Sequence, residues 1–382
     1  MPMHLVDATL FFSPTSGGVK RYLLAKRAWL ARHTNWQQTL LVPGESTRLE
    51  RGGVSTITGG IVPGTFNYRL PLKPWAWSRA LEQLAPDITE VGDVFHPAWC
   101  ARIAARRRNT PIVAFYHSNF PQLAGRRLGR AVEWLLANYV RETYAGFDRV
   151  FAPSRYMCDY LASIGVRHTT LQPLGVDADV FSPARRVRDL RHALGLKAAT
   201  RLLAFAGRFA KEKNLSVLLQ AFARLGDRYH LLLIGGDQTG RVASNVTKVA
   251  YRRDSRELAE WLASCDALVH AGTRETFGLV ILEAMACGRP VVGARAGAIP
   301  ELIDESVGTL ATPYDAVSMA RSIEALYDRD IESLGAAARE LVLRRFTWNQ
   351  ALQLQMQTYA GIARHSPTVT PAVEPIRLIE TR

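Results

Sequence analysis

The chain has 382 residues, of which 48% are hydrophobic and 21% are charged, the balance of a globular protein. This composition excludes a disordered tail protein, a collagen-like fibre and a disulfide-stabilised miniprotein, and no apolar run approaches the ~20 residues that span a bilayer. Lysine and arginine number 48 against 34 acidic residues, a net charge of +14, which favours an anionic partner such as nucleic acid, anionic lipid or a phosphorylated small molecule. Residues 1–150 hold 19 of these basic residues and only 10 of the acidic ones.

The chain start and the cysteines indicate an intracellular protein. Asp7 interrupts the first apolar stretch and no basic residue leads into it, so the start does not resemble a signal peptide. The four cysteines are scattered without the paired spacing of a zinc site or a disulfide framework. We therefore expect buried thiols and a cytoplasmic location.

Short apolar runs alternate with helical patterns in the first half of the chain. We predict strands at residues 5–12, 39–44, 88–91 and 111–116. A Ser-Pro-Thr-Ser-Gly-Gly loop at residues 13–18 precedes a predicted helix, whose core positions are Val19, Tyr22, Leu23, Leu24 and Trp29. Such alternation is typical of a parallel sheet covered by helices.

The pattern restarts in the second half. We predict strands at residues 201–206, 230–234 and 267–270, and a further one from residue 291. A helix with Asn214 as its N-cap has an apolar stripe spaced i, i+3, i+4, i+7, formed by Leu215, Leu218, Leu219, Phe222 and Leu225. A short helix at residues 279–286 ends before Gly288 and Pro290, the expected stop signals. Two prolines and a glycine in residues 171–183 mark a linker, so we expect two α/β domains with a ligand-binding cleft between them.

The segment Gly207-Arg208-Phe209-Ala210-Lys211-Glu212-Lys213-Asn214 follows a predicted strand and opens a helix. A glycine lets the turn close, and Arg208 and Lys213 are spaced so that both can face one anion. The helix N-terminus adds free amides and a positive dipole. The segment therefore predicts a diphosphate site, with a solvated basic turn as the alternative.

Two glutamates, Glu275 and Glu283, lie eight residues apart, one in a loop and one on the helix that follows. Glu283 interrupts an apolar run, where a carboxylate is costly unless it is paired or hydrogen-bonded. Polyol hydroxyls, backbone amides or a salt bridge would satisfy it. The amides of Gly278 and Leu279 begin the helix and can meet an oxygen-rich ligand. A structural carboxylate is the alternative for either glutamate singly.

Together, Gly207-Arg208 with Lys213 and the two glutamates within TRETFGLVILEAMACGRPVV closely resemble glycosyltransferase family 4, the retaining nucleotide-sugar transferases of the GT-B fold. Other segments are similar to further elements of this family: the first glycine loop at 16–19, a strand-to-helix element at 152–154, the linker at 175–183, and the final helix with Trp348 and Tyr359. The resemblance implies an α/β GT-B fold, with two Rossmann-like parallel-sheet domains facing a central cleft and a C-terminal helix crossing back to the N-terminal domain.

The resemblance also implies the domain boundaries. They are an acceptor-binding domain at residues 1–172, a linker at 173–183, a donor-binding domain at 184–345, a return helix at 346–364 and a tail at 365–382. The Pro- and Thr-rich start of the tail predicts disorder.

The resemblance implies a role for each motif. Arg208 and Lys213 would hold the donor diphosphate and stabilise the departing nucleoside diphosphate. Glu283 would accept hydrogen bonds from the ribose, and Glu275 from the donor sugar. The other donor contacts would be Gly17 and Gly18 at the phosphates, Phe277, Gly278 and Leu279 at the sugar and phosphate, and Gly235, Gly236 and residues 251–253 near the nucleobase.

His117 follows the predicted strand at 111–116 and resembles the family's active-site histidine near the sugar and the acceptor, with a loop histidine at the strand end as the alternative. The family implies a front-face reaction in which the leaving phosphate accepts the proton of the acceptor. Residues 177–179 and 328–330 have the D-x-D form of metal-dependent transferases, but neither is near the diphosphate turn. We therefore expect no metal and no other cofactor.

The N-terminal domain is expected to select the acceptor, which is lipid-linked, a polysaccharide or a small molecule. Its arginines cluster at residues 106–108 and at 126–130. The second cluster precedes a helix whose apolar residues are expected to face the core, namely Val132, Leu135, Leu136, Tyr139 and Val140. The charge would attract an anionic acceptor or the inner face of the cytoplasmic membrane. The donor base and sugar stay open, with UDP-glucose, UDP-linked amino sugars and GDP-mannose as candidates.

Other functions fit the sequence less well. A dinucleotide oxidoreductase needs G-x-G-x-x-G after the first strand, and the loop at residues 13–18 does not match it. A nucleic-acid binder would suit the charge, but no helix-turn-helix, zinc-finger or aromatic RNA-binding signature is present. A sugar-nucleotide epimerase and an inactive transferase share the GT-B architecture. The intact basic and acidic motif residues weigh against the inactive form.

Overall fold

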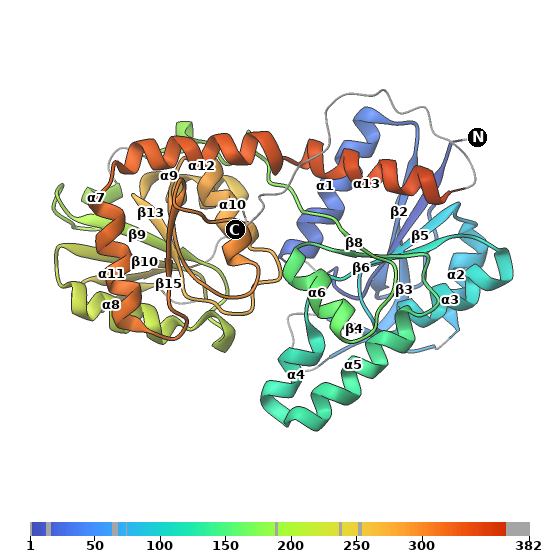
Figure 1. The fold of residues 1–382 in the computed structure, drawn as a ribbon. Helices are drawn as coiled ribbons and strands as arrows, with labels where there is room; N and C mark the ends of the chain where they lie inside the picture. The colour runs from blue at the N-terminus through green and yellow to red at the C-terminus, as the bar shows by residue number, and fades with distance from the viewer. Residues whose placement is uncertain are drawn as a thin grey trace. The chain divides into compact units, whose positions relative to one another are not determined.

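The computed structural model describes residues 2–12, 17–62, 68–73, 75–187, 190–236, 239–250 and 254–363. Within these residues the chain divides into two compact units. Unit 1 runs to Leu174 and resumes at Trp348, and unit 2 is Gly175–Thr347. Each unit is a largely parallel sheet with helices packed on it (Figure 1). The predicted α/β class is therefore confirmed in both units.

Unit 1 contains an eight-stranded sheet in the order β4-β3-β2-β1-β5-β6-β7-β8. Every neighbouring pair is parallel except β3 with β4. Its elements are β1 (His4–Ala8), α1 (Gly18–His33), β2 (Gln37–Gly44), β3 (Val54–Ile61), β4 (Arg69–Pro71), α2 (Ala76–Leu84), β5 (Ile88–Val91), α3 (His96–Arg108), β6 (Ile112–Phe115), α4 (Phe120–Leu128), α5 (Arg130–Tyr144), β7 (Arg149–Ala152), α6 (Arg155–Ser163), β8 (Thr169–Leu171) and α13 (Trp348–Ile362).

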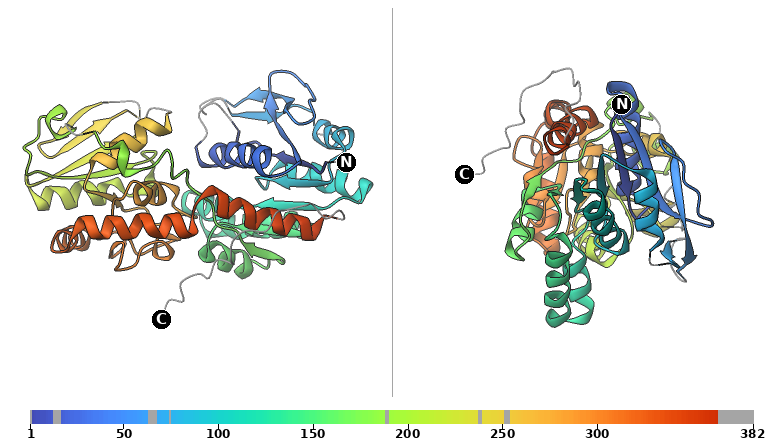
Figure 2. Two further views of the ribbon diagram at one scale, coloured as in Figure 1. Left: turned by 90° about the horizontal axis from the view of Figure 1, so that it is seen from above. Right: turned by 90° about the vertical axis from the view of Figure 1, so that its right-hand side faces the viewer.

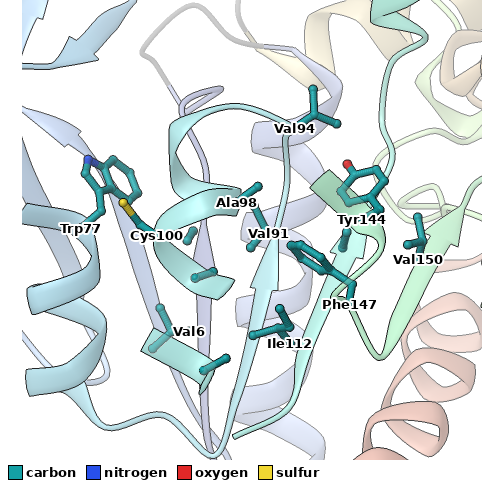
Figure 3. Packing of buried hydrophobic residues seen from close by; sticks show 14 of the residues in the cluster. Val6, Trp77, Val91, Val94, Ala98, Cys100, Ile112, Tyr144, Phe147 and Val150 are labelled. Atoms are coloured by element: carbon teal, nitrogen blue, oxygen red, sulfur yellow. The ribbon is translucent and has the colours of Figure 1, made fainter. Parts of the chain in front are cut away.

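The central strands of unit 1 are buried on both faces, as parallel strands covered by helices must be. Every residue of β1, β5 and β6 is buried. On one face the side chains pack with α2, α3 and α5 into an apolar core around Trp77, Ile112 and Phe147 (Figure 3). The strands predicted at 88–91 and 111–116 lie at the centre of this sheet. The strand predicted at 5–12 is shorter, because β1 ends at Ala8.

The helix predicted after residue 18 is α1, and its buried face differs from the prediction at three positions. Val19 is only partly buried. Tyr22, Leu23 and Trp29 are buried as expected, whereas Leu24 is 44% exposed and Lys26 is fully buried. The buried face of α1 therefore includes the lysine at position 26 and leaves out the leucine at position 24.

Unit 2 contains a seven-stranded sheet in the order β11-β12-β10-β9-β13-β14-β15, parallel except for β11 with β12. The stop signals predicted after residue 286 are present, because α10 ends at Ala286 and Gly288 has a φ of +70°. The elements of the unit are η1 (Pro183–Arg185), α7 (Leu190–Ala193), β9 (Arg201–Ala206), η2 (Lys211–Lys213), α8 (Leu215–Leu225), β10 (Tyr229–Ile234), β11 (Gly240–Ala243), β12 (Val246–Val249), α9 (Ser255–Ser264), β13 (Ala267–His270), α10 (Leu279–Ala286), β14 (Val291–Ala294), η3 (Ile299–Glu301), β15 (Gly308–Ala311), α11 (Ala316–Tyr327) and α12 (Ile331–Arg345).

The last described helix, α13, belongs to unit 1 although it follows unit 2 in the chain. It packs against α1 (Figure 1). Trp29 of α1 donates its indole N–H to Oδ1 of Asn349 at 2.8 Å, and Gln172 donates to the carbonyl oxygen of Ala351 at 2.8 Å. The expected C-terminal helix that returns to the N-terminal domain is thus present.

Candidate functional site

The turns after β9 and β10 touch each other. The two strands are parallel neighbours, so Gly207 and Gly235, which follow them, meet at the carboxyl edge of the sheet. A Cβ atom on Gly235 would lie 2.1 Å from the carbonyl oxygen of Gly207, and φ at Gly235 is +155°, so only glycine fits here. The structure thus places Gly235 against the predicted diphosphate turn. Residues 251–253, predicted near the nucleobase, lie outside the described residues.

Lys213 and Glu275 form an ion pair between loops that are far apart in sequence. Nζ of Lys213 donates a hydrogen bond to Oε1 of Glu275. The pair forms because β9 and β13 are neighbours in the sheet, so the loops that follow them meet at one edge, the usual ligand site of such sheets. The two side chains are 19% and 15% exposed, so the pair is shielded but still reaches the surface.

His270 supplies a second donor to the same carboxylate. It is the last residue of β13, and its Nε2 lies 3.1 Å from Oε1 of Glu275. Its Nδ1 accepts a hydrogen bond from the amide of Gly272 at 3.2 Å, which leaves Nε2 as the ring nitrogen that can donate to the carboxylate. The sequence predicts only a strand here. The signal in the sequence would have been that His270, a polar residue, ends an apolar strand five residues before Glu275.

Glu275 is held in its ionised form. Burial would raise the pKa of its carboxyl group, but the Lys213 ammonium and the hydrogen bond from His270 hold that pKa well below its usual range. An ionised carboxylate accepts hydrogen bonds and donates none. This side chain is therefore suited to receive the hydroxyl groups of a ligand.

The backbone around Glu275 is fixed by two neighbouring loops. The amide of Ala298 donates to the carbonyl oxygen of Glu275 at 3.0 Å, and a Cβ on Gly297 would lie 2.8 Å from that oxygen. Asn214 donates its side-chain amide to the carbonyl of Ala271 at 2.9 Å. Asn214 occupies the N-cap position of α8 but makes no side-chain cap hydrogen bond. The predicted N-cap position is therefore confirmed, but the side-chain amide ties two loops of the site together instead of capping the helix.

Arg208 is placed on the same turn but apart from the ion pair. Its side chain is 82% exposed, and its guanidinium lies 3.9 Å from the carboxylate of Glu212. Within the part of the chain that the structure describes, neither a hydrogen bond nor an ion pair joins Arg208 to Lys213 or Glu275. An exposed arginine keeps its planar set of donors available for an anion.

The other residues predicted to bind the nucleotide-sugar donor in unit 2 lie at or near the start of α10. Gly278 has a φ of +103° at the N-cap position, and Leu279 is the first helical residue, where backbone amides lack intrahelical partners. Phe277 is buried and packs edge-on against Phe346, with ring centroids 6.2 Å apart. Glu283 lies in the body of the helix and is 2% exposed. The predicted carboxylate within an apolar helix is therefore a buried one.

In unit 1, Gly17 and Gly18 form the start of α1. A Cβ on Gly17 would have no atom within 4 Å, so the backbone here is open to a ligand. Residues 13–16 of the predicted glycine loop lie outside the described residues.

His117 lies two residues beyond β6, beside a small cavity. Its ring stacks on Phe115 with centroids 4.3 Å apart and lies 5.2 Å from the ring of Tyr22. Burial, and secondarily the charge of Lys26, lower the pKa of His117 to about 3, so the ring is neutral at physiological pH. The cavity is lined by His117, Asp93, Ser118, Gly92 and Val94, and by six aromatic residues: Phe11, Phe95, Phe115, Tyr116, Phe120 and Tyr144.

Asp93 is a residue of this cavity that the sequence analysis missed. Its carboxylate accepts hydrogen bonds from the amide of Leu10 at 2.7 Å, the hydroxyl of Thr9 at 3.0 Å and the amide of Phe95 at 3.0 Å. Burial raises the pKa of Asp93 to about 6. These contacts hold Thr9 and Leu10, the two residues that follow β1, against Asp93.

The two D-x-D segments have structural roles. Asp177 Oδ1 accepts the amides of Asp179 and Val180 at 3.1 and 3.0 Å. Asp330 caps α12 through the amides of Glu332 and Ser333. Across the part of the chain that the structure describes, no group of three or more His, Cys, Asp or Glu side chains is arranged to hold a metal ion.

A second surface of note is the helical hairpin formed by α4 and α5, which lie side by side (Figure 2). The prediction that the apolar residues of α5 face the core is wrong for Leu135, which is 61% exposed next to Trp134 at 69%. The buried residues of α5 are at its far end, from Val140 onward. The two helices pack closely, because a Cβ on Gly125 would lie 2.5 Å from the Glu133 side chain. Apolar side chains are therefore exposed at the end of the hairpin where α4 meets α5.

Among the described residues, no helix combines the length and the apolar character needed to span a bilayer.

Comparisons with known proteins give a consistent result. Residues 16–180 match the family model described as Glycosyltransferase Family 4, and residues 200–329 match Glycosyl transferases group 1. The chain is 29% identical over 379 residues to a GDP-mannose-dependent alpha-(1-6)-phosphatidylinositol dimannoside mannosyltransferase of Mycobacterium tuberculosis, covering 94% of this chain and 97% of that protein. It is 30% identical over 270 residues to a GDP-mannose-dependent alpha-mannosyltransferase of the same species, covering 68% and 70%.

Among solved structures, the chain resembles Anabaena HepE in complex with UDP and glucose. The TM-score is 0.74 at 20% identity, over 94% of this chain and 99% of that one. This likeness concerns the fold, and it agrees with the two parallel-sheet units described above.

Proposed function

Because the chain belongs to glycosyltransferase family 4 and is a glycosyltransferase, we propose that it moves a hexose from a nucleotide diphosphate sugar to a hydroxyl of a lipid-linked or saccharide acceptor, with retention of the anomeric configuration. The observation that carries this proposal is the cluster of Lys213, Glu275 and His270 at the carboxyl edge of the unit 2 sheet. The cluster offers a cation for a diphosphate and an ionised carboxylate for sugar hydroxyls in one place.

These groups support the following reaction. The ammonium of Lys213 has three donors, so it can keep Glu275 in place and also bind a phosphate oxygen. With Arg208, it would stabilise the charge that develops as the bond between the anomeric carbon and the phosphate breaks. The acceptor oxygen would bond to the anomeric carbon on the same face, and its proton would pass to the leaving phosphate. The buried Glu283 would bind the ribose.

The cations supplied by Arg208 and Lys213 support a reaction without a metal or another cofactor. GDP-mannose is the first donor to test, since two relatives are named as GDP-mannose-dependent. UDP-glucose is the second, since a structural neighbour was solved with UDP and glucose. Activity that persists in EDTA, and a product with the anomeric configuration of the donor by proton NMR, would support both parts of the mechanism.

Two substitutions on one turn test the donor site. Lys213→Ala should reduce transfer and donor hydrolysis by a factor of 100 or more, the order seen when a group that stabilises transition-state charge is removed. Lys211→Ala is the matched control, because Lys211 is exposed on the same turn and should keep activity within twofold. Unfolding curves confirm that both variants fold. Near-normal activity of Lys213→Ala would contradict the assignment.

We also propose that the hairpin of α4 and α5 rests on an anionic membrane. Its tip exposes Leu128, Trp134 and Leu135 at 68%, 69% and 61%, next to the exposed Arg126 and Arg127. A helix with apolar and basic side chains on its free surface suits the boundary of an anionic bilayer, where tryptophan is favoured. His117 lies three residues before α4, so this contact would bring the acceptor side of unit 1 to the lipid.

Vesicle sedimentation tests the membrane contact. The Trp134→Ala and Leu135→Ser double variant, and separately the Arg126→Gln and Arg127→Gln double variant, should bind phosphatidylglycerol vesicles at least tenfold more weakly. Arg224→Gln with Arg228→Gln is the control, because it removes two exposed charges from unit 2. Equal binding of all three variants, or equally tight binding to phosphatidylcholine alone, would contradict the proposal.

A further inference from the structure

The core of unit 1 contains a buried cluster of ionisable side chains that the proposed chemistry does not use. Asp7 of β1 and Glu90 of β5 are register partners on adjacent parallel strands, so two carboxylates lie next to each other. Lys26 of α1 lies between them, with its Nζ 2.6 Å from Asp7 Oδ1 and 2.9 Å from Glu90 Oε1. The lysine is fully buried and the two acids are 2% and 1% exposed. Such a cluster is a poor source of stability, because desolvating the charges offsets their attraction.

The same cluster is where α13 attaches to unit 1. Gln355 donates to Glu90 Oε2 at 3.0 Å and to the hydroxyl of Tyr22 at 2.5 Å. Tyr359 donates its hydroxyl to Glu90 Oε2, and Tyr22 donates to Glu90 Oε1 at 2.9 Å. All three polar groups are fully buried or nearly so. Besides the bonds at Asn349 and Ala351, directed hydrogen bonds to one carboxylate therefore specify the seat of α13 more narrowly than an apolar interface would.

Tyr22 connects this seat to His117. Its ring centroid lies 5.2 Å from that of His117, 4.9 Å from Phe115 and 6.3 Å from Trp348, the first residue of α13. The ammonium of Lys26 lies 4.5 Å from the same ring, a distance typical of a cation–π contact. The ring of Tyr22 thus lies beside the candidate active-site histidine, and the hydroxyl of Tyr22 bonds to Gln355 of α13.

We propose that Tyr22 is a positioning residue: through its hydroxyl bonds to Glu90 and Gln355, the seating of α13 sets the orientation of the His117 ring. The importance of that orientation for transfer rests on the proposed function, whereas the link between α13 and His117 does not. α13 begins directly after Thr347, the last residue of unit 2, and its first residue, Trp348, lies beside the ring of Tyr22.

The test uses two substitutions of uncharged residues that leave Asp7, Lys26 and Glu90 themselves unchanged. Tyr22→Phe removes the hydroxyl and keeps the ring, and Gln355→Leu removes the donor on α13. Each should lower kcat about tenfold, with the donor KM within twofold, because misplacing a catalytic group by a fraction of an ångström is enough for such a loss. The double variant should lose no more than the worse single one, because both act through one link.

A spectroscopic readout separates this link from the proposed activity. In protein labelled with 13C-histidine, the His117 signal, assigned with His117→Gln, should shift in Gln355→Leu, because residue 355 donates hydrogen bonds to the hydroxyl of Tyr22 and to Glu90. Tyr160→Phe is the matched control, because it removes another buried hydroxyl of unit 1 and should leave kcat and the His117 signal unchanged.

Three outcomes would overturn the proposal. They are an unshifted His117 signal in Gln355→Leu, additive kcat losses in the double variant, or a Tyr160→Phe effect as large as that of Tyr22→Phe. If the His117 signal responds to Gln355→Leu while His117→Gln itself transfers normally, the link stands and the role of His117 in the proposed function fails.

Discussion

The ion pair of Lys213 with Glu275 allows a prediction with a magnitude. Two unit charges about 4 Å apart attract each other by about 4 kcal/mol at an effective dielectric constant of about 20. Desolvation of two largely buried side chains consumes much of this attraction, and the exposure of 19% and 15% lets water screen part of the rest. We therefore expect a net coupling of about 1–2 kcal/mol between the two residues.

A double-mutant cycle with Lys213→Met and Glu275→Gln measures this coupling. Lys213→Met leaves the carboxylate with His270 as its donor, and Glu275→Gln leaves the lysine near the surface, where water can reach it. Each single change should reduce the free energy of unfolding of unit 2 by about 1–2 kcal/mol, and the double variant should lose less than their sum by the coupling energy. Urea unfolding and thermal unfolding give the values, with about 2–4 °C of Tm for each kcal/mol in a unit of this size.

A parallel cycle with Lys211→Met and Glu275→Gln controls for the change in net charge on the turn, and it should show no coupling. Additivity of Lys213→Met and Glu275→Gln within about 0.3 kcal/mol would refute the reasoning, because it would mean that the two side chains do not interact in the folded protein. The same result would remove the observation on which the proposed donor site depends.

Three further predictions concern single residues. The pKa of His117 is lowered to about 3 in the folded state against about 6.5 unfolded, so its contribution to stability is complete above pH 6.5 and is lost as the pH falls. Between pH 7 and 5, the free energy of unfolding of the wild type in urea should therefore fall by about 2 kcal/mol more than that of His117→Gln. Equal losses would contradict a buried neutral ring. His270→Leu should reduce kcat at least tenfold while His270→Gln, which keeps a donor toward Glu275, restores most of it, and equal defects would show a packing role instead. Gly235→Ala places a Cβ 2.1 Å from a backbone oxygen and should lower Tm by several degrees, whereas Gly361→Ala, with nothing within 4 Å, should leave Tm unchanged or raise it.

The parts of the fold that could be predicted are those encoded by local pattern. Apolar runs such as residues 201–206 and 230–234 correspond to β9 and β10, because strands buried on both faces need continuous apolar sequence. β3 was not predicted, because it alternates and contains Gly59 and Gly60, which are weak strand formers. The exposed face of α5 was predicted to be buried, because periodicity shows that a helix has an apolar face but does not show what covers it.

The donor side of the site was accessible from sequence only as separate motifs. Lys213 and Glu275 each stood in a recognisable segment, but their contact depends on β9 and β13 being neighbours, which the order of elements along the chain does not give. His270 and Gly297 were missed for the same reason. Each is ordinary in its own segment and becomes significant only because the folded sheet sets it against Glu275.

Lys26 shows most clearly what a local reading of sequence cannot supply. On α1 it lies one helical turn after Tyr22, among residues that pack inward, and a lysine at such a position is ordinarily placed in solvent. It is buried because Asp7 and Glu90, 83 positions apart in the chain, are register partners in the sheet beneath it. Two adjacent buried carboxylates repel each other unless a cation lies between them. Strand pairing therefore explains the buried lysine on α1. Tyr22, one turn before it, bonds to the same Glu90 and lies with its ring beside His117.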